Sequence, residues 1–157
     1  MDTPEESIEV IDFKPELKDH FRRLNYEWIK KYFRIEELDI ALLEHPQENI
    51  IDQGGFVFYA KKGEEIVGTA ALLKIEEGVF ELAKMGVSEK LRNHGIGNIL
   101  LEHCIVFSQA HHFKKLILYT NKILRPAIHL YEKYGFTEAP FEPGHYARGD
   151  LKMELVL

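Results

Sequence analysis

Two kinds of hydrophobic spacing meet in the middle of the chain. Over Val79–Val87 the side chains fall into two interleaved sets, one at odd and one at even positions. This period of two predicts a strand with two distinct faces. Glu81 falls on the face that also carries Met85 and Val87, and that face is otherwise apolar. Over Ile96–Ala110 the apolar residues recur instead at the spacing of an amphipathic helix.

Spacing along the rest of the chain predicts one mixed α/β domain over residues 1–157. Three strands joined by short turns should form an antiparallel meander. The long helix forms a crossover connection, which should place the strand after it beside the last strand of the meander and parallel to it. In chain order, the expected elements are strand Ser7–Phe13, a helix from Pro15 to about Phe33, helix Glu36–Glu44, strands Phe56–Ala60, Ile66–Ile75 and Val79–Val87, helix Ile96–Ala110, strand Lys115–Thr120, a helix from about Arg125 to Lys133, and a closing hairpin of Phe136–Phe141 with Leu151–Leu157.

The balance of charges argues against one class of partner. The chain has 157 residues, is 45% hydrophobic and carries a formal net charge of -6. No basic run is longer than two residues, which argues against a nucleic-acid surface. The acidic balance mildly favours a cationic substrate such as an amine, although a role in solubility explains the same charge equally well.

A single cysteine, Cys104, rules out an internal disulfide and suits a reducing compartment. On the apolar side of a helix it is much more often a small core residue than a nucleophile. No signal peptide or membrane-spanning segment is visible, so we expect a soluble cytoplasmic protein. The eight histidines show no spacing typical of a zinc site, so no metal is expected.

The loop Arg92–Gly97 joins the central strand to the long helix, and its chemistry suits a diphosphate. Glycines let backbone N–H groups turn toward an anion, and a helix start leaves about four N–H groups unpaired. Arg92 adds a permanent cation. A Walker loop is excluded because no Gly-Lys-Ser/Thr follows, and Leu100 stands where a dinucleotide fingerprint needs its third glycine. Taken alone, Gly95 and Gly97 would more often mark an ordinary tight turn.

This loop and a second block later in the chain together resemble the GNAT superfamily of acyl-CoA-dependent N-acetyltransferases. The residues that carry the resemblance are Arg92-x-x-Gly95-x-Gly97, Tyr119-Thr-Asn121 and Leu130-Tyr131-x-x-x-Gly135-Phe136. The likeness covers about Phe56 to Phe136 best. It implies a mixed, mostly antiparallel sheet of about six or seven strands with a splayed parallel pair, flanked by about four helices.

The resemblance also implies an enzyme that transfers an acetyl group from acetyl-CoA to a primary amine of a small molecule or peptide. No covalent intermediate is expected, because Cys104 has the pattern of a core residue. Similar proteins are frequently dimers, so a homodimer is allowed. A non-catalytic acyl-CoA-binding sensor on the same fold is the alternative, since fold does not fix activity.

On the family pattern, the glycine loop would hold the diphosphate, and backbone groups of the central strand would pair with the pantetheine arm. The expected cofactor-binding residues are Met85, Val87, Arg92, Asn93, His94, Gly95, Ile96, Gly97, Asn98 and Asn121. Asn121 would either bond to the arm or cap the following helix. Asn93 replaces a glycine common in the family, and asparagine tolerates left-handed backbone angles. His94 replaces a lysine or arginine, so acyl-CoA affinity should rise as the pH falls and the imidazole gains its charge.

Attack of an amine on a thioester needs a base for the amine proton and an acid for the departing thiolate. Glu81 matches a glutamate that serves as base in several family members, and burial should raise its pKa toward the working pH. A strand face that turns polar, or pairing with a cation, would explain Glu81 equally well. Tyr131 is the expected acid, and core packing of the helical stripe that contains it is the alternative.

In the family the first two helices border the acceptor pocket. The expected acceptor-binding residues are Tyr32, Phe33, Tyr146 and Arg148. Core packing of an aromatic stripe would explain Tyr32 and Phe33 almost equally well, and Trp28 in the same stripe is expected in the core. Tyr146 would orient the acceptor, whereas Arg148 would hold a carboxylate of the acceptor or pair with Asp150.

Overall fold

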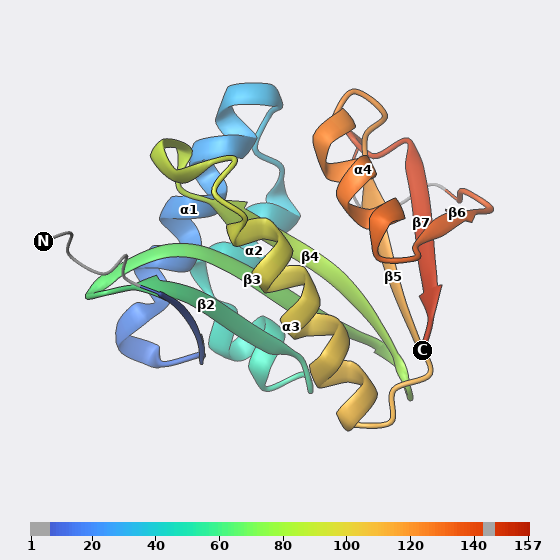
Figure 1. Ribbon diagram of the computed structural model, residues 1–157, viewed down its shortest axis with the longest axis horizontal. Helices are drawn as coiled ribbons and strands as arrows, with labels where there is room; N and C mark the ends of the chain where they lie inside the picture. The colour runs from blue at the N-terminus through green and yellow to red at the C-terminus, as the bar shows by residue number, and fades with distance from the viewer. Residues whose placement is uncertain (1–6, 143–146) are drawn as a thin grey trace, which may run out of the picture.

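The computed structural model describes residues 7–142 and 147–157 (Figure 1). In chain order these residues form β1 (Ile8–Asp12), η1 (Pro15–Leu17), α1 (Lys18–Tyr32), α2 (Glu37–Glu44), η2 (Gln47–Ile51), β2 (Phe56–Lys62), β3 (Glu65–Glu76), β4 (Val79–Val87), η3 (Glu89–Leu91), α3 (Ile96–Ala110), β5 (Lys115–Thr120), α4 (Arg125–Lys133), β6 (Thr137–Ala139) and β7 (Leu151–Val156). The order of predicted helices and strands is confirmed.

The main omission of the sequence prediction is the π-helical turn η2. His45 and Pro46 do end α2, as predicted, but Pro46 has helical backbone angles (φ −65°, ψ −33°) and begins the new turn. Proline is compatible with a helix start because the N–H group that it lacks would be unpaired there. The same residue that ends one helix therefore starts another.

The described strands form one seven-stranded sheet in the order β1-β2-β3-β4-β5-β7-β6. Every neighbouring pair is antiparallel except β4 and β5, which are parallel. That parallel pairing joins only Val79–Glu81 to Lys115–Ile117, and beyond it the two strands diverge (Figure 1). The predicted mixed sheet with a splayed parallel pair is thus confirmed.

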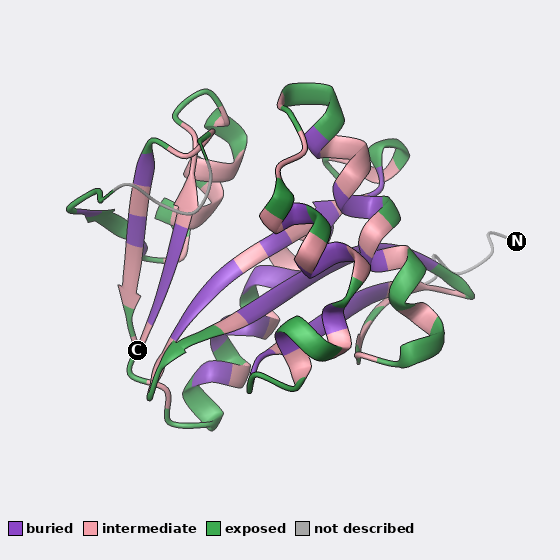
Figure 2. Ribbon diagram, turned by 180° about the vertical axis from the view of Figure 1, so that it is seen from behind, coloured by how far each residue is buried: buried purple, intermediate pink, exposed green. Residues whose placement is uncertain are grey.

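Helices cover both faces of the sheet. α3 and α4 lie over one face, and α1 and α2 lie over the other (Figure 1). Buried apolar residues accordingly form two clusters, one centred on α3 and one between α1, α2 and strands β2 and β3. Seen from the α1 and α2 side, the central strands are mostly buried, whereas the outer surfaces of the helices are exposed (Figure 2). The sheet therefore separates two hydrophobic cores, one on each of its faces.

A bulge in β4 corrects the alternation predicted for this strand. The pairing of β4 with β3 changes register between Ala83 and Gly86, and Lys84 has a positive φ of 54°. One extra residue in a strand reverses which face the following side chains occupy. Met85 and Val87 consequently pack in the α3 core, whereas Lys84 reaches Asp39 of α2. The prediction that Glu81 shares a face with Met85 and Val87 is therefore wrong, and the residue on Glu81's side is Lys84.

Candidate active site

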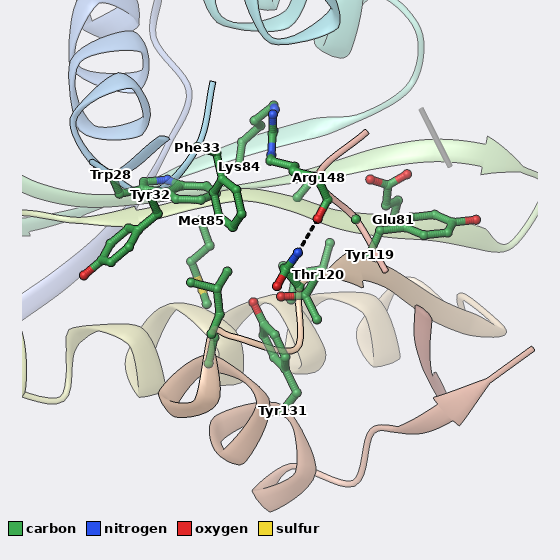
Figure 3. Close-up of a pocket in the computed structure, with 16 residues that line it drawn as sticks. Trp28, Tyr32, Phe33, Glu81, Lys84, Met85, Tyr119, Thr120, Tyr131 and Arg148 are labelled. Carbon is green, nitrogen blue, oxygen red and sulfur yellow. Dashed lines mark hydrogen bonds between the residues drawn. The ribbon is translucent and has the colours of Figure 1, made fainter. Parts of the chain in front are cut away.

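A cavity of about 220 Å³ lies where β4 and β5 separate (Figure 3). Its wall is built by α1 and the residue after it, by β4, by β5 and the segment into α4, and by the residues just before β7. The lining residues are Trp28, Tyr32, Phe33, Glu81, Leu82, Ala83, Lys84, Met85, Tyr119, Thr120, Asn121, Leu124, Ala127, Tyr131, Arg148 and Gly149. The fold thus brings side chains that lie far apart in sequence together around one cavity.

Glu81 is the acidic side chain in this lining, and it is 4% exposed. Burial raises the pKa of its carboxyl to about 7, and the nearby Lys84 ammonium opposes that rise without cancelling it. In residues 7–142 and 147–157, no hydrogen bond or ion pair involves the Glu81 carboxylate. The predicted rise of its pKa has the predicted physical cause, because water is withdrawn and no donor replaces it.

Asp39, on α2, is a second buried carboxylate beside the cavity and is fully shielded from solvent. It accepts hydrogen bonds from the Lys84 ammonium at 2.5 Å, from both guanidinium nitrogens of Arg148 at 2.6 and 2.8 Å, and from the backbone N–H of Glu36 at 2.8 Å. Burial alone would raise the pKa of Asp39, but the bonds from Arg148 and Lys84 outweigh it and hold that pKa below its usual range. The Asp39 carboxylate is therefore held as an anion.

Arg148 connects the segment before β7 to α2. Besides Asp39, its guanidinium donates to the Glu36 carboxylate at 3.1 Å, and the Ala147 N–H donates to the same carboxylate at 2.9 Å. The predicted alternative of an Arg148–Asp150 pair is wrong, because the Asp150 carboxylate accepts the Lys122 N–H and the Arg148 guanidinium binds the carboxylates near α2. Arg148 was predicted to bind a carboxylate of the acceptor, but its guanidinium already binds carboxylates of the protein itself.

The glycine loop before α3 contains two residues with left-handed backbone angles. Asn93 and Gly95 both adopt left-handed backbone angles, with φ of 67° and 80°, which bears out the prediction that asparagine replaces glycine here. Gly95 is the N-cap of α3, and a Cβ added there would meet no atom within 4 Å. The space beside Gly95 at the start of α3 is thus open. Binding of a diphosphate by this loop stays a prediction.

Side chains of the other predicted cofactor residues serve varied purposes. Ile96 is buried in the α3 core, so it can offer a ligand only its backbone, and the Asn98 amide oxygen accepts a bond from Lys133 of α4 at 3.2 Å. Gly97 faces Leu130 of α4, where an added Cβ would lie 3.5 Å from that side chain. His94 is exposed beside Asn93. These contacts fix α4 against the start of α3.

Asn121 lies in the cavity wall, but its side chain already has partners. The amide nitrogen donates to the Arg148 carbonyl at 2.6 Å, and the amide oxygen accepts the Ile123 N–H at 3.0 Å. The N-cap of α4 is Leu124, which has no side-chain cap. Asn121 therefore fastens the segment before β7 to the end of β5, and the predicted helix-capping role is wrong.

Aromatic residues complete the cavity. Trp28, which the pattern assigned to the core, lies in the wall beside Phe33 with a ring-centroid distance of 6.4 Å. Tyr32 reaches the glycine loop, where its hydroxyl accepts a bond from Arg92 at 3.4 Å. Tyr131 projects from α4 into the cavity, opposite the α1 aromatics (Figure 3). Burial raises the pKa of Tyr131 to about 12, so its hydroxyl keeps its proton at neutral pH.

Two residues of this arrangement escaped the sequence analysis, and one predicted residue lies outside the described chain. Tyr146 falls in the undescribed segment 143–146. Asp39 and Lys84 were missed. Other charged residues lie near both in the sequence, Glu37 near Asp39 and Glu81 near Lys84, so charge alone did not mark them. The available signal was Gly86, because an isolated glycine in a strand suggests a bulge or a close backbone approach.

Comparison with known proteins identifies the family. The model of the acetyltransferase (GNAT) family matches residues 22–136, which is most of the chain. The chain belongs to this family. The resemblance predicted from the two sequence blocks is thereby confirmed, and both blocks lie within the matched residues.

Solved structures of GNAT proteins share the fold. An acetyltransferase of the GNAT family from Staphylococcus aureus MU50 has a TM-score of 0.83 at 23% identity, covering 94% of this chain and 98% of that one. The PaiA N-acetyltransferase from Thermoplasma acidophilum, solved in complex with coenzyme A, has a TM-score of 0.76 at 18% identity, covering 96% and 99%. At these identities the likeness extends to the fold only.

A curated relative matches over a shorter length. Mycothiol acetyltransferase of Corynebacterium glutamicum strain R is 35% identical over 83 residues, which cover 53% of this chain and 28% of that protein. The chain thus spans less than a third of this relative. Within residues 7–142 and 147–157, no helix is long and apolar enough to cross a membrane, and no group of three or more His, Cys, Asp or Glu is placed to hold a metal ion.

Proposed function

We propose that this GNAT protein transfers an acetyl group from acetyl-CoA directly to a primary amine of a small molecule or peptide. The observation that carries the proposal is the buried Glu81 carboxyl, which faces the cavity without a hydrogen-bonding partner in the described chain and has a pKa raised to about 7. A general base works best when its pKa lies near the operating pH. A carboxylate with a purely structural role would be expected to have a partner, as Asp39 does.

The residues around the cavity fit the cosubstrate. Bound acetyl-CoA supplies the activated acetyl group. The N–H groups at the start of α3 suit its diphosphate, because a helix N-terminus carries partial positive charge, and Arg92 lies beside them. Past Glu81, β4 no longer pairs with β5, so its backbone near Met85 can pair with an extended arm. The CoA complex of PaiA from Thermoplasma acidophilum supports this assignment on the same fold.

Two proton transfers would accompany the reaction. As the new N–C bond forms and the thioester C–S bond breaks, Glu81 accepts a proton from the amine and Tyr131 donates one to the departing sulfur. The high pKa of Tyr131 keeps the donor protonated, whereas the pKa of Glu81 leaves a useful fraction ionised at neutral pH. Cys104 is fully buried in the α3 core, which supports a direct transfer without an acetylated cysteine.

The test is release of CoA thiol from acetyl-CoA with a panel of polyamines, amino acids, aminoglycosides and peptide N-termini. We expect release that depends on an added amine, together with an N-acetylated product of the corresponding mass. Binding of acetyl-CoA without release toward any of these amines would overturn the proposal in favour of the sensor.

Matched variants separate chemistry from folding. Glu81→Gln should lower kcat/KM by about 10²–10⁴-fold, the range typical of a lost general base. The exposed Glu76 of β3 provides the control, since Glu76→Gln should leave activity within about twofold, as surface substitutions usually have small effects.

Tyr131→Phe should lower kcat by about tenfold or more, because proton donation to the leaving group is lost while the ring that packs on Phe136 is kept. Tyr134 lies outside the cavity lining on the same helix end, so Tyr134→Phe is the matched control. Full turnover by the Tyr131→Phe enzyme would remove the acid role.

A further inference from the structure

The charged side chains around the cavity differ in whether other protein groups already bind them. Of the described residues in the lining, three are charged at neutral pH or close to it: Glu81, Lys84 and Arg148. Both cations bind the carboxylate of Asp39, and Arg148 also binds that of Glu36, whereas Glu81 has no such bond. A ligand therefore meets two cations already engaged by the protein and one carboxyl that is not.

The local charge follows from this arrangement. Counted over the described residues, and with Glu81 ionised, the cluster holds three carboxylates and two cations: Glu36, Asp39 and Glu81 against Lys84 and Arg148. The cluster is shielded, with side-chain exposures of 3% for Lys84, 0% for Asp39 and 12% for Arg148. Charges in such surroundings are poorly screened by water, so the net negative charge acts strongly on a bound molecule.

The remaining wall is aromatic and aliphatic. Trp28 and Phe33 form one side, and Tyr119 and Tyr131 lie across the cavity from them (Figure 3). The Trp28 indole N–H donates to Asn25, and the Tyr119 hydroxyl donates to Glu142, so both polar tips already have protein partners. These rings offer a ligand mainly apolar surface.

We propose that the acceptor is a primary amine with an apolar body and no carboxylate beside the amine, and that Asp39 sets this preference by neutralising Lys84 and Arg148. The inference rests on the proposed function, since it takes the amine to be the group that meets Glu81. An α-amino acid would bring its carboxylate into the net negative charge of this cluster, and like charges that are juxtaposed in a site repel one another. An arylalkylamine pairs one ammonium with the one available carboxyl and covers its body with the rings.

Three ligands of matched shape test the preference in the wild-type protein. Phenethylamine lacks the carboxylate, phenylalanine carries it, and phenylalanine amide replaces it by an uncharged group of similar size. Calorimetry on protein saturated with CoA, which has no acetyl group to give, measures binding alone. We expect phenethylamine and phenylalanine amide to bind within about threefold of one another, and both at least about tenfold more tightly than phenylalanine. Phenylalanine binding as tightly as its amide would overturn the proposal, as would spermidine binding more tightly than phenethylamine.

A variant assigns the effect to Asp39. Asp39→Asn leaves two carboxylates against two cations, so the preference for phenylalanine amide over phenylalanine should fall to about threefold or less. Asp52→Asn, at an exposed aspartate that accepts a bond from Gln47, should keep the wild-type preference. An Asp39→Asn protein that folds by circular dichroism and keeps the full preference would overturn the role of Asp39. If that variant does not fold, the wild-type comparison of phenylalanine with its amide still decides the substrate class.

Turnover with acetyl-CoA then separates this inference from the function on which it rests. Tight binding of phenethylamine without acetylation would overturn the proposed enzyme activity and leave the ligand preference supported. Acetylation of phenylalanine at the rate of phenethylamine, with equal binding of the two, would overturn the preference and leave the enzyme activity supported.

Discussion

Glu81 and Asp39 are two buried carboxylates on the same side of the sheet, and they have opposite properties. Asp39 receives four hydrogen bonds, and its pKa is held below the usual range. Glu81 receives none from the described chain, and its pKa is raised to about 7. Both are shielded from solvent, with exposures of 0% and 4%. Burial alone therefore does not decide the state of a carboxylate, and the number of donors around it does.

The comparison separates an ion that holds the fold together from one that is available for chemistry. Asp39 joins three distant segments, namely α2, the bulge of β4 and the segment before β7. Glu81 makes no such bond to any part of the chain that the structure describes, and it faces the cavity. Lys84 links the two, because its ammonium binds Asp39 directly and limits the rise in the pKa of Glu81.

The largest effect on stability should come from breaking the well-bonded carboxylate. Asp39→Ala should lower the free energy of unfolding by about 3–5 kcal/mol, because Lys84 and Arg148 lose the anion that compensates for their burial. Urea denaturation at neutral pH measures it. The exposed Asp52→Ala control should change stability by about 0.5 kcal/mol or less. A loss for Asp39→Ala no larger than that of the control would show that the cluster does not hold the fold together.

Glu81 should behave in the opposite way. Its pKa in the folded protein, about 7, lies above the ordinary glutamate value of 4.5, so the folded state holds the proton more tightly than the unfolded state does. Stability is therefore complete below the ordinary value and is lost as the pH rises through about 7. The expected loss is on the order of 3 kcal/mol.

Glu81→Gln cannot titrate, so it should become more stable than wild type as the pH rises from 5 to 8, by roughly 2–3 kcal/mol. Urea denaturation of both proteins across that range checks the slope. Glu76→Gln serves as control, and its difference from wild type should stay flat. Parallel pH curves for wild type and Glu81→Gln would contradict the raised pKa.

The smallest effect concerns the exposed His94 in the glycine loop between β4 and α3. His94→Arg should tighten CoA binding by about two- to fivefold at pH 7.5, since an exposed charge pair contributes about 0.2–1 kcal/mol. Calorimetry of CoA with both proteins at that pH measures the difference. An unchanged affinity in His94→Arg would count against a place for His94 beside the diphosphate.

The sequence predicted most elements because their patterns are local. Neighbouring residues determine the periodicity of α3, the tolerance of Asn93 for left-handed angles, and the turn from β4 through the glycine loop into α3. Glu81 and Tyr131 were found through motifs, and the fold places both in the lining of one cavity. What escaped prediction depends on contacts between distant segments.

The β4 bulge shows this limit. Its Lys84 has positive φ without being glycine, so alternation in the sequence assigned the later residues to the wrong face. Asp39 completes the capping box of α2 by accepting the Glu36 N–H, and its bonds to Lys84 and Arg148 come from residues 45 and 109 positions away. No single stretch of sequence contains that cluster.

The most direct test of the account is the pH dependence of kcat/KM for acetyl transfer in wild type and in Glu81→Gln. If Glu81 is the base, kcat/KM of the wild type should rise as the pH approaches 7, because the carboxyl must lose its proton to act. The profile should show an inflection at about pH 7 and a smaller slope above it. The variant should be slower throughout and lack that inflection. An inflection that survives in Glu81→Gln at undiminished activity would contradict the central claim.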